Sequence, residues 1–152
     1  MTVHFDTIPF DSPVFPEIQR VQKANARELL HSAGDTILPV VFAGDFNAAA
    51  DDSSDPNPSF GTYQIFVNGN FKDAWKEVHP NEPGFTCFQD QNLLNAASKL
   101  NHRIDLILFR GVPGFKDVVL AGDQQADRTT PSRLWPSDHA GLAGTLKRDG
   151  EE

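Results

Sequence analysis

The segment from residue 38 to residue 47, Leu-Pro-Val-Val-Phe-Ala-Gly-Asp-Phe-Asn, constrains the fold of this chain more than any other. Its first half is an unbroken apolar run, which is typical of a strand buried on both faces of a sheet. The run stops at Gly44 and delivers Asp45 and Asn47, whose spacing places both side chains on one side of an extended chain. Because open α/β sheets bind ligands at the carboxyl ends of their strands, the pair indicates a site. An Asx-type turn, in which both residues bond only their own backbone, explains the pair equally well.

A β-α-β order surrounds this segment. We expect a short strand at residues 2–6, an amphipathic helix at residues 17–33 and a buried strand at residues 37–43. Two short helical pieces are expected within residues 60–78. Further strands are expected at residues 85–88, 103–109, 116–121 and 140–146. The pattern predicts an α/β fold, with one domain over residues 1–147 and a disordered tail at residues 148–152.

The length, composition and net charge of the chain indicate which classes of protein it can belong to. The 152 residues are enough for one domain with a hydrophobic core, and no apolar run approaches the length of a membrane span. The net charge of −8 argues against a module that holds nucleic acid through a basic face. It does not argue against hydrolysis of phosphate esters, because a divalent cation supplies positive charge locally. The single cysteine, Cys87, is expected to be a small buried core residue.

Two further stretches carry candidate functional groups. Asp105 lies on an otherwise apolar strand, where a carboxylate must be paired or hydrogen-bonded. Its partner is either Arg103, in a structural ion pair, or a histidine, in a functional one. A long loop at residues 122–137, of a kind that is often functional, ends in the motif Ser137-Asp138-His139.

Together, His4, Gly44-Asp45-Phe46-Asn47, Arg103-Ile104-Asp105 and Ser137-Asp138-His139 resemble the motifs of the endonuclease/exonuclease/phosphatase superfamily. The resemblance implies part of an α/β sandwich of two sheets with helices outside. It runs from His4 to the last strand but covers only the later part of the family's domain. The earlier portion, which supplies an asparagine and a metal-binding glutamate, has no counterpart here and is expected to be absent.

The resemblance implies Mg²⁺- or Mn²⁺-dependent hydrolysis of phosphate esters by in-line attack of water. By this resemblance His139 is the base that takes the water's proton, and Asp105 orients it. Asp138 is the implied metal ligand.

Three more roles follow from the same resemblance. Asp45 would orient the nucleophile or protonate the leaving oxygen, and Asn47 would hold a phosphoryl oxygen. His4 would donate to the phosphorane as charge builds on its oxygens. Arg128 and Arg133, in the long loop, are candidates for binding substrate phosphate, although basic loop residues are usually only solvated.

The expected substrate is a phosphodiester, either nucleic acid or a small or lipid phosphodiester. The acidic net charge slightly favours a small or lipid phosphodiester. A different hypothesis is a catalytically inactive fragment or assembly module. An apolar sheet edge, left open where the missing N-terminal half would pack, would then drive self-association. A third hypothesis, a nucleic-acid binding module without chemistry, predicts salt-sensitive binding in the absence of metal.

Overall fold

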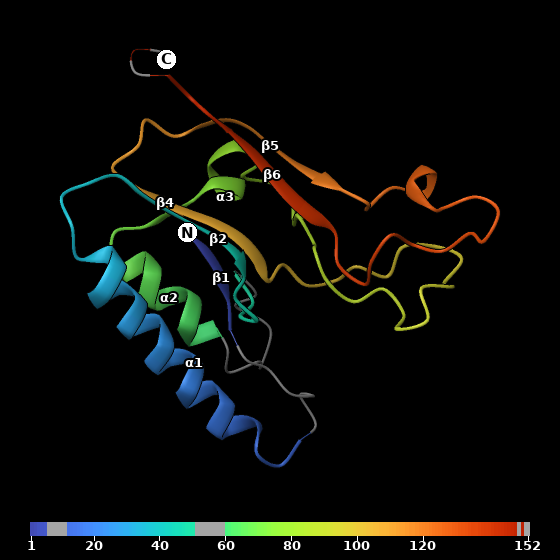
Figure 1. Ribbon diagram of the computed structural model, residues 1–152, viewed down its shortest axis with the longest axis horizontal. Coiled ribbons are helices and arrows are strands. Elements are labelled where there is room, and N and C mark those ends of the chain that lie inside the picture. Colours follow the sequence, from blue (N-terminus) through green and yellow to red (C-terminus); the bar gives the residue numbers. More distant parts are fainter. Residues whose placement is uncertain (6–11, 51–59, 149, 151–152) are drawn as a thin grey trace.

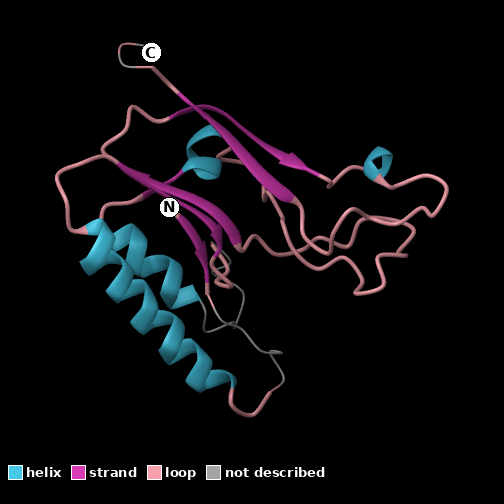
Figure 2. Cartoon of the chain, in the orientation of Figure 1, coloured by secondary structure: helices cyan, strands magenta, loops and turns pink. Residues whose placement is uncertain are grey.

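A computed structural model describes residues 1–5, 12–50, 60–148 and 150 of the chain. Two sheets form its centre (Figures 1 and 2). The first has the strand order β1 (Thr2–His4), β2 (Val40–Asp45), β4 (Asp105–Arg110) and β3 (Lys72–Asp73). β1 runs parallel to β2, whereas the other neighbours are antiparallel. The second sheet is the antiparallel pair β5 (Phe115–Ala121) and β6 (Gly141–Leu146). The predicted α/β fold with two sheets is confirmed.

Two helices lie side by side on the outer face of the first sheet (Figure 1). They are α1 (Phe15–Leu29), whose last turn widens into a π-helix over Leu30–Gly34, and α2 (Phe60–Asn68). Pro16 stands in the first turn of α1, where its missing N–H leaves no helical bond unmade. Phe42 of β2 and Phe66 of α2 are fully buried between the helices and the sheet. This aromatic contact fixes the helical layer to the strand that carries Asp45.

The other face of β4 packs toward the second sheet. Leu106 and Leu108 belong to the helix-side core, while Ile107 and Phe109 belong to a second core with β5 and the short helix α3 (Ala74–Val78). The rings of Phe109 and Phe115 meet edge to face at 5.2 Å. β4 is therefore buried on both faces, which is typical of a strand with a continuous apolar run such as residues 106–109.

Several boundaries differ from the sequence-based expectation. β2 begins at Val40 instead of residue 37 and extends through Asp45, and Leu38 is 67% exposed instead of buried. Pro39 accounts for the late start, because proline has no backbone N–H to donate to the sheet. Residues 85–88 do not form the expected strand: within this stretch only Cys87 makes isolated bridges, to His102 and to His139.

Two segments fall largely outside the described residues. Most of residues 48–59 does so, although residues 48–50 are buried. In the predicted tail, only Arg148 and Gly150 are described, so its disorder stays a prediction. Among the described helices, none has the length and apolar character needed to cross a membrane.

Candidate active site

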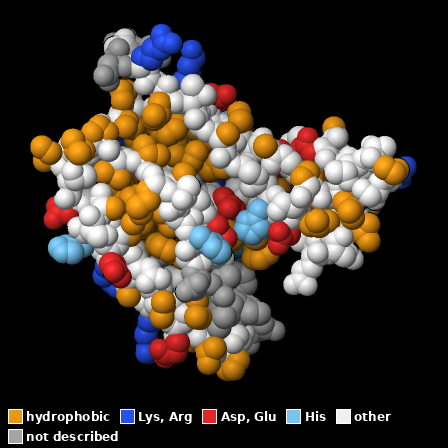
Figure 3. Space-filling view, viewed as in Figure 1, with side chains coloured by type: hydrophobic (Ala, Val, Ile, Leu, Met, Phe, Trp, Pro, Cys, Tyr) orange, Lys and Arg blue, Asp and Glu red, His pale blue; other side chains and the backbone are white. Residues whose placement is uncertain are grey.

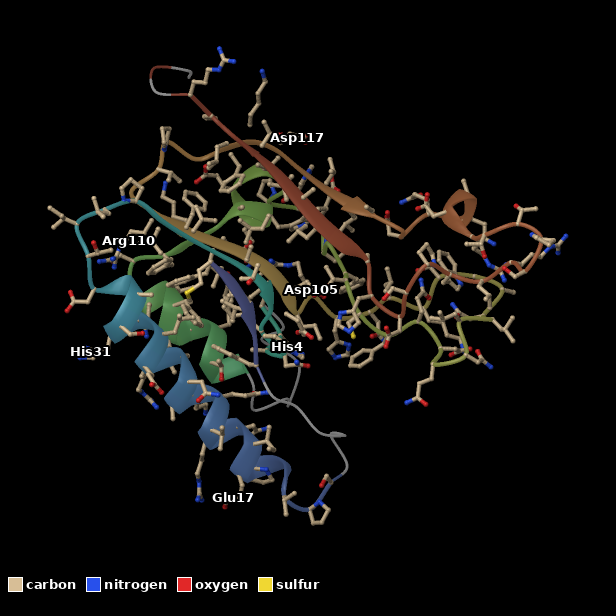
Figure 4. All side chains as sticks on the ribbon, in the orientation of Figure 1. His4, Glu17, His31, Asp105, Arg110 and Asp117 are labelled. Atoms are coloured by element: carbon tan, nitrogen blue, oxygen red, sulfur yellow. The ribbon has the colours of Figure 1, made fainter. Side chains whose placement is uncertain are left out.

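The site is built where three neighbouring strands bring polar side chains to one end of the first sheet. His4, Asp45 and Asp105 are successive register partners across β1, β2 and β4. The His4 and Asp105 side chains lie at this end of the sheet in Figure 4. Gly44 makes the arrangement possible, because a Cβ atom there would lie 1.9 Å from the carbonyl oxygen of Val3. The strands can therefore approach only where residue 44 has no side chain.

His139 reaches this end of the sheet from the chain that leads into β6. Its Nδ1 lies 2.8 Å from Oδ2 of Asp105, and both side chains are partly buried. The hydrogen bond to Asp105 stabilises the imidazolium and raises the pKa of His139 to about 11. Arg103, the alternative partner, instead pairs with Asp73 at 2.6 Å, and both of those side chains are buried. Of the two partners considered for Asp105, the structure selects the histidine.

Asp45 and Asn47 form an Asx-type turn at the same end of the sheet. The backbone N–H of Asn47 donates to Oδ1 of Asp45 at 2.7 Å, and its Nδ2 donates to Oδ2 at 3.1 Å. Nδ2 also donates to the carbonyl oxygen of Phe5 at 2.7 Å, so both amide hydrogens are engaged within the chain. Asn47 has a φ of 46° rather than an extended conformation. The Asx-type turn is therefore present, and the role of Asn47 in holding a phosphoryl oxygen stays a prediction.

Several ionisable side chains lie close together at this end of the sheet. Burial raises the pKa of Asp45, an effect that the Asn47 N–H opposes and the nearby Asp105 carboxylate reinforces. His4, whose side chain is 76% exposed, places Nε2 3.8 Å from Oδ2 of Asp45. Acidic and histidine side chains gather near the middle of the face shown in Figure 3. The side chains of Asp45, Asp105 and His139 are 20%, 19% and 28% exposed.

The cluster also fits a divalent cation. Asp45, Asp105 and His139 each offer a ligand atom, and these atoms all lie within 4.8 Å of one another. Two carboxylates and one imidazole, with no thiolate among them, suit Mg²⁺ or Mn²⁺. Asp138, the ligand implied by resemblance, is not a member of this group; its side chain is exposed and accepts a hydrogen bond from Ser137 Oγ at 3.3 Å.

The two loop arginines make contacts within or near their own loop. Arg128 donates to the carbonyl oxygen of Ala96 at 3.3 Å and lies 5.8 Å from the Trp135 ring centroid. Arg133 is exposed, with a φ of 56°. The loop extends to the end of the molecule opposite the helices (Figure 1). A role for either arginine in binding substrate stays a prediction.

Sequence reasoning missed two residues behind the Asp105–His139 pair. Thr86 Oγ1 accepts hydrogen bonds from the backbone N–H groups of Ile104, at 3.2 Å, and Asp105, at 3.1 Å. Cys87 is buried, as predicted, but its Sγ also lies 3.2 Å from Nε2 of His139. No local pattern signals these contacts, because Cys87 and His139 are 52 residues apart.

Comparison with known proteins agrees with this geometry. Residues 3–139 match the model of the Endonuclease/Exonuclease/phosphatase family. The chain belongs to this family. No curated protein matches it at a significant level.

Many solved structures share its fold. The chain is similar to an AP endonuclease from Archaeoglobus fulgidus, with a TM-score of 0.69 and 19% identity over 97% of this chain and 60% of that one. It is also similar to the 3′ phosphatase NExo from Neisseria bound to a product DNA hairpin, with a TM-score of 0.67 and 23% identity. That match covers 91% of this chain and 56% of NExo. The chain thus spans less than two thirds of the length of these two structures.

Proposed function

We propose that this chain carries the catalytic acid–base groups of a metal-dependent phosphoesterase. The observation that carries the proposal is the Asp105–His139 hydrogen bond of 2.8 Å, formed beside the carboxylate of Asp45. A histidine whose Nδ1 is held by a carboxylate presents Nε2 for proton transfer. Membership of the family supports hydrolysis of a phosphate ester as the reaction.

The chemistry follows from the positions of three side chains. Nε2 of His139 takes a proton from water as the water oxygen attacks phosphorus in line with the leaving oxygen. A P–O bond forms to the water oxygen, and the P–O bond to the leaving group breaks. A carboxylate that binds a cation is ionised, so Asp45 would orient the attacking water, and the leaving oxygen would take its proton from solvent water. His4, on the adjacent strand, would donate to the phosphoryl oxygens as they gain charge.

The Asp45 and Asp105 carboxylates, together with Asp138, would hold Mg²⁺ or Mn²⁺, because Nδ1 of His139 is bonded to Asp105 and Nε2 is the proton acceptor. Such a cation supplies charge stabilisation for the phosphoryl group and favours the neutral form of a neighbouring imidazole. His139 needs this help, because its hydrogen bond to Asp105 otherwise favours the imidazolium at neutral pH. A proton acceptor must be neutral before it can act.

A nucleic-acid phosphodiester is the proposed substrate. The NExo structure, described as bound to a product DNA hairpin, and the AP endonuclease support this class over a small or lipid phosphodiester. A pocket of about 210 Å³ is lined by Ala49, Arg103 and Phe85, the first two close in sequence to Asn47 and Asp105, and Phe85 is 39% exposed. Exposed aromatic rings stack on unpaired bases. The acidic net charge makes the cation necessary for binding as well as for chemistry.

Hydrolysis of a chromogenic phosphodiester and of a short single-stranded DNA tests the proposal. Turnover should require Mg²⁺ or Mn²⁺, stop with chelator and be lost in His139→Ala. His31→Ala, which changes an exposed histidine on the π-helical turn, is the matched control and should keep full activity. Turnover that survives His139→Ala would refute the assignment.

A second candidate is a non-catalytic assembly module. The feature that favours it is the second sheet, where Val119 of β5 is 45% exposed and Leu146 of β6 is 46% exposed. Exposed apolar strands at an open edge drive association with other chains. Size-exclusion chromatography with light scattering separates the candidates: a folded monomer at every concentration would remove the assembly hypothesis.

A further inference from the structure

Cys87 occupies a position beside the nitrogen that the proposed reaction uses. Its Sγ lies 3.2 Å from Nε2 of His139, on the opposite side of the ring from the Nδ1 contact with Asp105. The residue is 3% exposed. Among the described residues, no other hydrogen bond to this nitrogen is found. The imidazole is therefore held between a carboxylate and a thiol.

The backbone fixes the sulfur relative to both members of the catalytic pair. On one side, the N–H of Cys87 donates to the carbonyl oxygen of His102 at 3.0 Å. On the other side, the N–H of Phe88 donates to the carbonyl oxygen of Asp138 at 3.1 Å. Cys87 thus bridges the chain that leads into Asp105 and the chain that carries His139.

The residue before it strengthens this connection. Thr86 is fully buried, and its Oγ1 accepts the backbone N–H groups of Ile104 and Asp105. Its carbonyl oxygen accepts the N–H of Ala140 at 2.7 Å. Any movement of Cys87 would therefore disturb the backbone next to Asp105 and His139 together.

We propose that Cys87 is a positioning residue that holds the His139 ring in the orientation required for proton transfer. The inference rests on the proposed function, because a ring that takes a proton from water must point its Nε2 atom toward that water. A misdirected base loses rate without losing substrate affinity.

A thiol suits this task for two reasons. It is both a weak donor and a weak acceptor, so it can bond to Nε2 whether or not that nitrogen carries a proton. Because the bond is weak, the thiol orients the ring before water binds and is then replaced at Nε2 at little cost. Burial also raises the pKa of Cys87, which keeps the sulfur uncharged. An alanine would offer neither bond, whereas a serine would offer both with a shorter reach.

The test compares Cys87→Ala with Cys87→Ser in the full chain. The first readout is independent of activity: the order parameter of the His139 ring, measured by ¹³C relaxation of its Cε1–H group. We expect this order parameter to fall in Cys87→Ala and to stay near the wild-type value in Cys87→Ser. Val118→Ala removes atoms from the second core, away from the ring, and should leave the order parameter unchanged.

The second readout is steady-state hydrolysis. We expect kcat to fall about ten-fold in Cys87→Ala with KM changed less than about two-fold, and Cys87→Ser to recover most of the loss. Unchanged ring order in a folded Cys87→Ala protein would overturn the inference even if the enzyme is active. An inactive wild-type chain whose ring order still depends on Cys87 would instead count against the proposed function alone.

Discussion

Asp45 and Asp105 are directly opposed register partners at the point where β2 ends and β4 begins. Two carboxylates so placed repel each other, and each is balanced separately. Asp105 is balanced by His139, and Asp45 by the Asn47 N–H groups, with His4 nearby. The two carboxylates still lie within one cluster, and a cation, or a phosphoryl transition state with its cation, would relieve their repulsion.

Binding of Mg²⁺ or Mn²⁺ should therefore stabilise the folded chain. A cation at one hundred times its dissociation constant adds about 2.7 kcal/mol to the free energy of unfolding. We expect the rise in Tm to be largely lost in Asp45→Asn. Asp117→Asn, which removes an exposed carboxylate from β5, should keep it and serves as the control. An equal rise in Asp45→Asn would exclude Asp45 as a ligand.

The same titration decides the role of Asp138, which resemblance implies as a ligand but which lies outside the cluster of three. If Asp138 turns toward the cation on binding, Asp138→Asn should reduce the rise in Tm as strongly as Asp45→Asn. A wild-type rise in Asp138→Asn would restrict the ligands to the cluster.

The Asp105–His139 pair should make stability depend on pH in the metal-free protein. The folded-state pKa of His139 is raised from 6.5 to about 11, so its stabilising contribution is complete below pH 6.5 and is lost as pH rises toward 11. Asp105→Asn removes the main cause of the shift. Urea unfolding should show a wild-type advantage over Asp105→Asn that is largest near about pH 6 and shrinks by about pH 10. An advantage that grows with pH would contradict the sign.

Gly44→Ala should damage the fold and the site together. The added methyl group would meet the Val3 carbonyl oxygen in a backbone with φ of +147°. We expect the free energy of unfolding to fall by at least about 2 kcal/mol, because β1 must separate from β2. Gly141→Ala, where the nearest atom is 3.7 Å away, should change it by no more than about 0.5 kcal/mol. Chemical denaturation measures both.

The Arg103–Asp73 ion pair should contribute to stability and not to chemistry. Its side chains are 2% and 3% exposed, so Arg103→Met leaves the buried Asp73 carboxylate without its cationic partner and should cost about 3–5 kcal/mol. Lys72→Met breaks an exposed pair with Glu77 and should cost less than about 1 kcal/mol. A mild effect of Arg103→Met on unfolding, with a large loss of kcat, would place Arg103 in the site instead.

The sequence predicted those parts of this structure that depend on local pattern. The alternation of apolar residues around Asp105 is enough to predict β4, and the amphipathic spacing before Gly34 is enough to predict α1. What local pattern could not decide was the partner of Asp105, since Arg103 is two residues away and His139 is 34 residues away. Only the packing of the second sheet brings His139 close, while Asp73 takes Arg103.

The contacts of Cys87 and Asn47 could not be predicted from the sequence for the same reason. Cys87, between Thr86 and Phe88, has no sequence feature that sets it apart from an ordinary core residue. Its link to His139 depends on two chain segments that meet only in the folded protein. The engagement of the Asn47 amide with Phe5 likewise depends on the approach of β1 to β2. Tertiary contacts of this kind leave no periodic signal in a single sequence.

The central claim is that Asp105 acts through His139 as one catalytic unit, and a double-mutant cycle on hydrolysis tests it most directly. His139→Ala should lower kcat by about 10²–10⁴-fold, the usual contribution of a general base. Asp105→Asn should also lower it, but the double variant should be no slower than His139→Ala alone, because residues that act as a unit are not additive. If the two losses instead multiply, Asp105 and His139 act independently and the account is wrong.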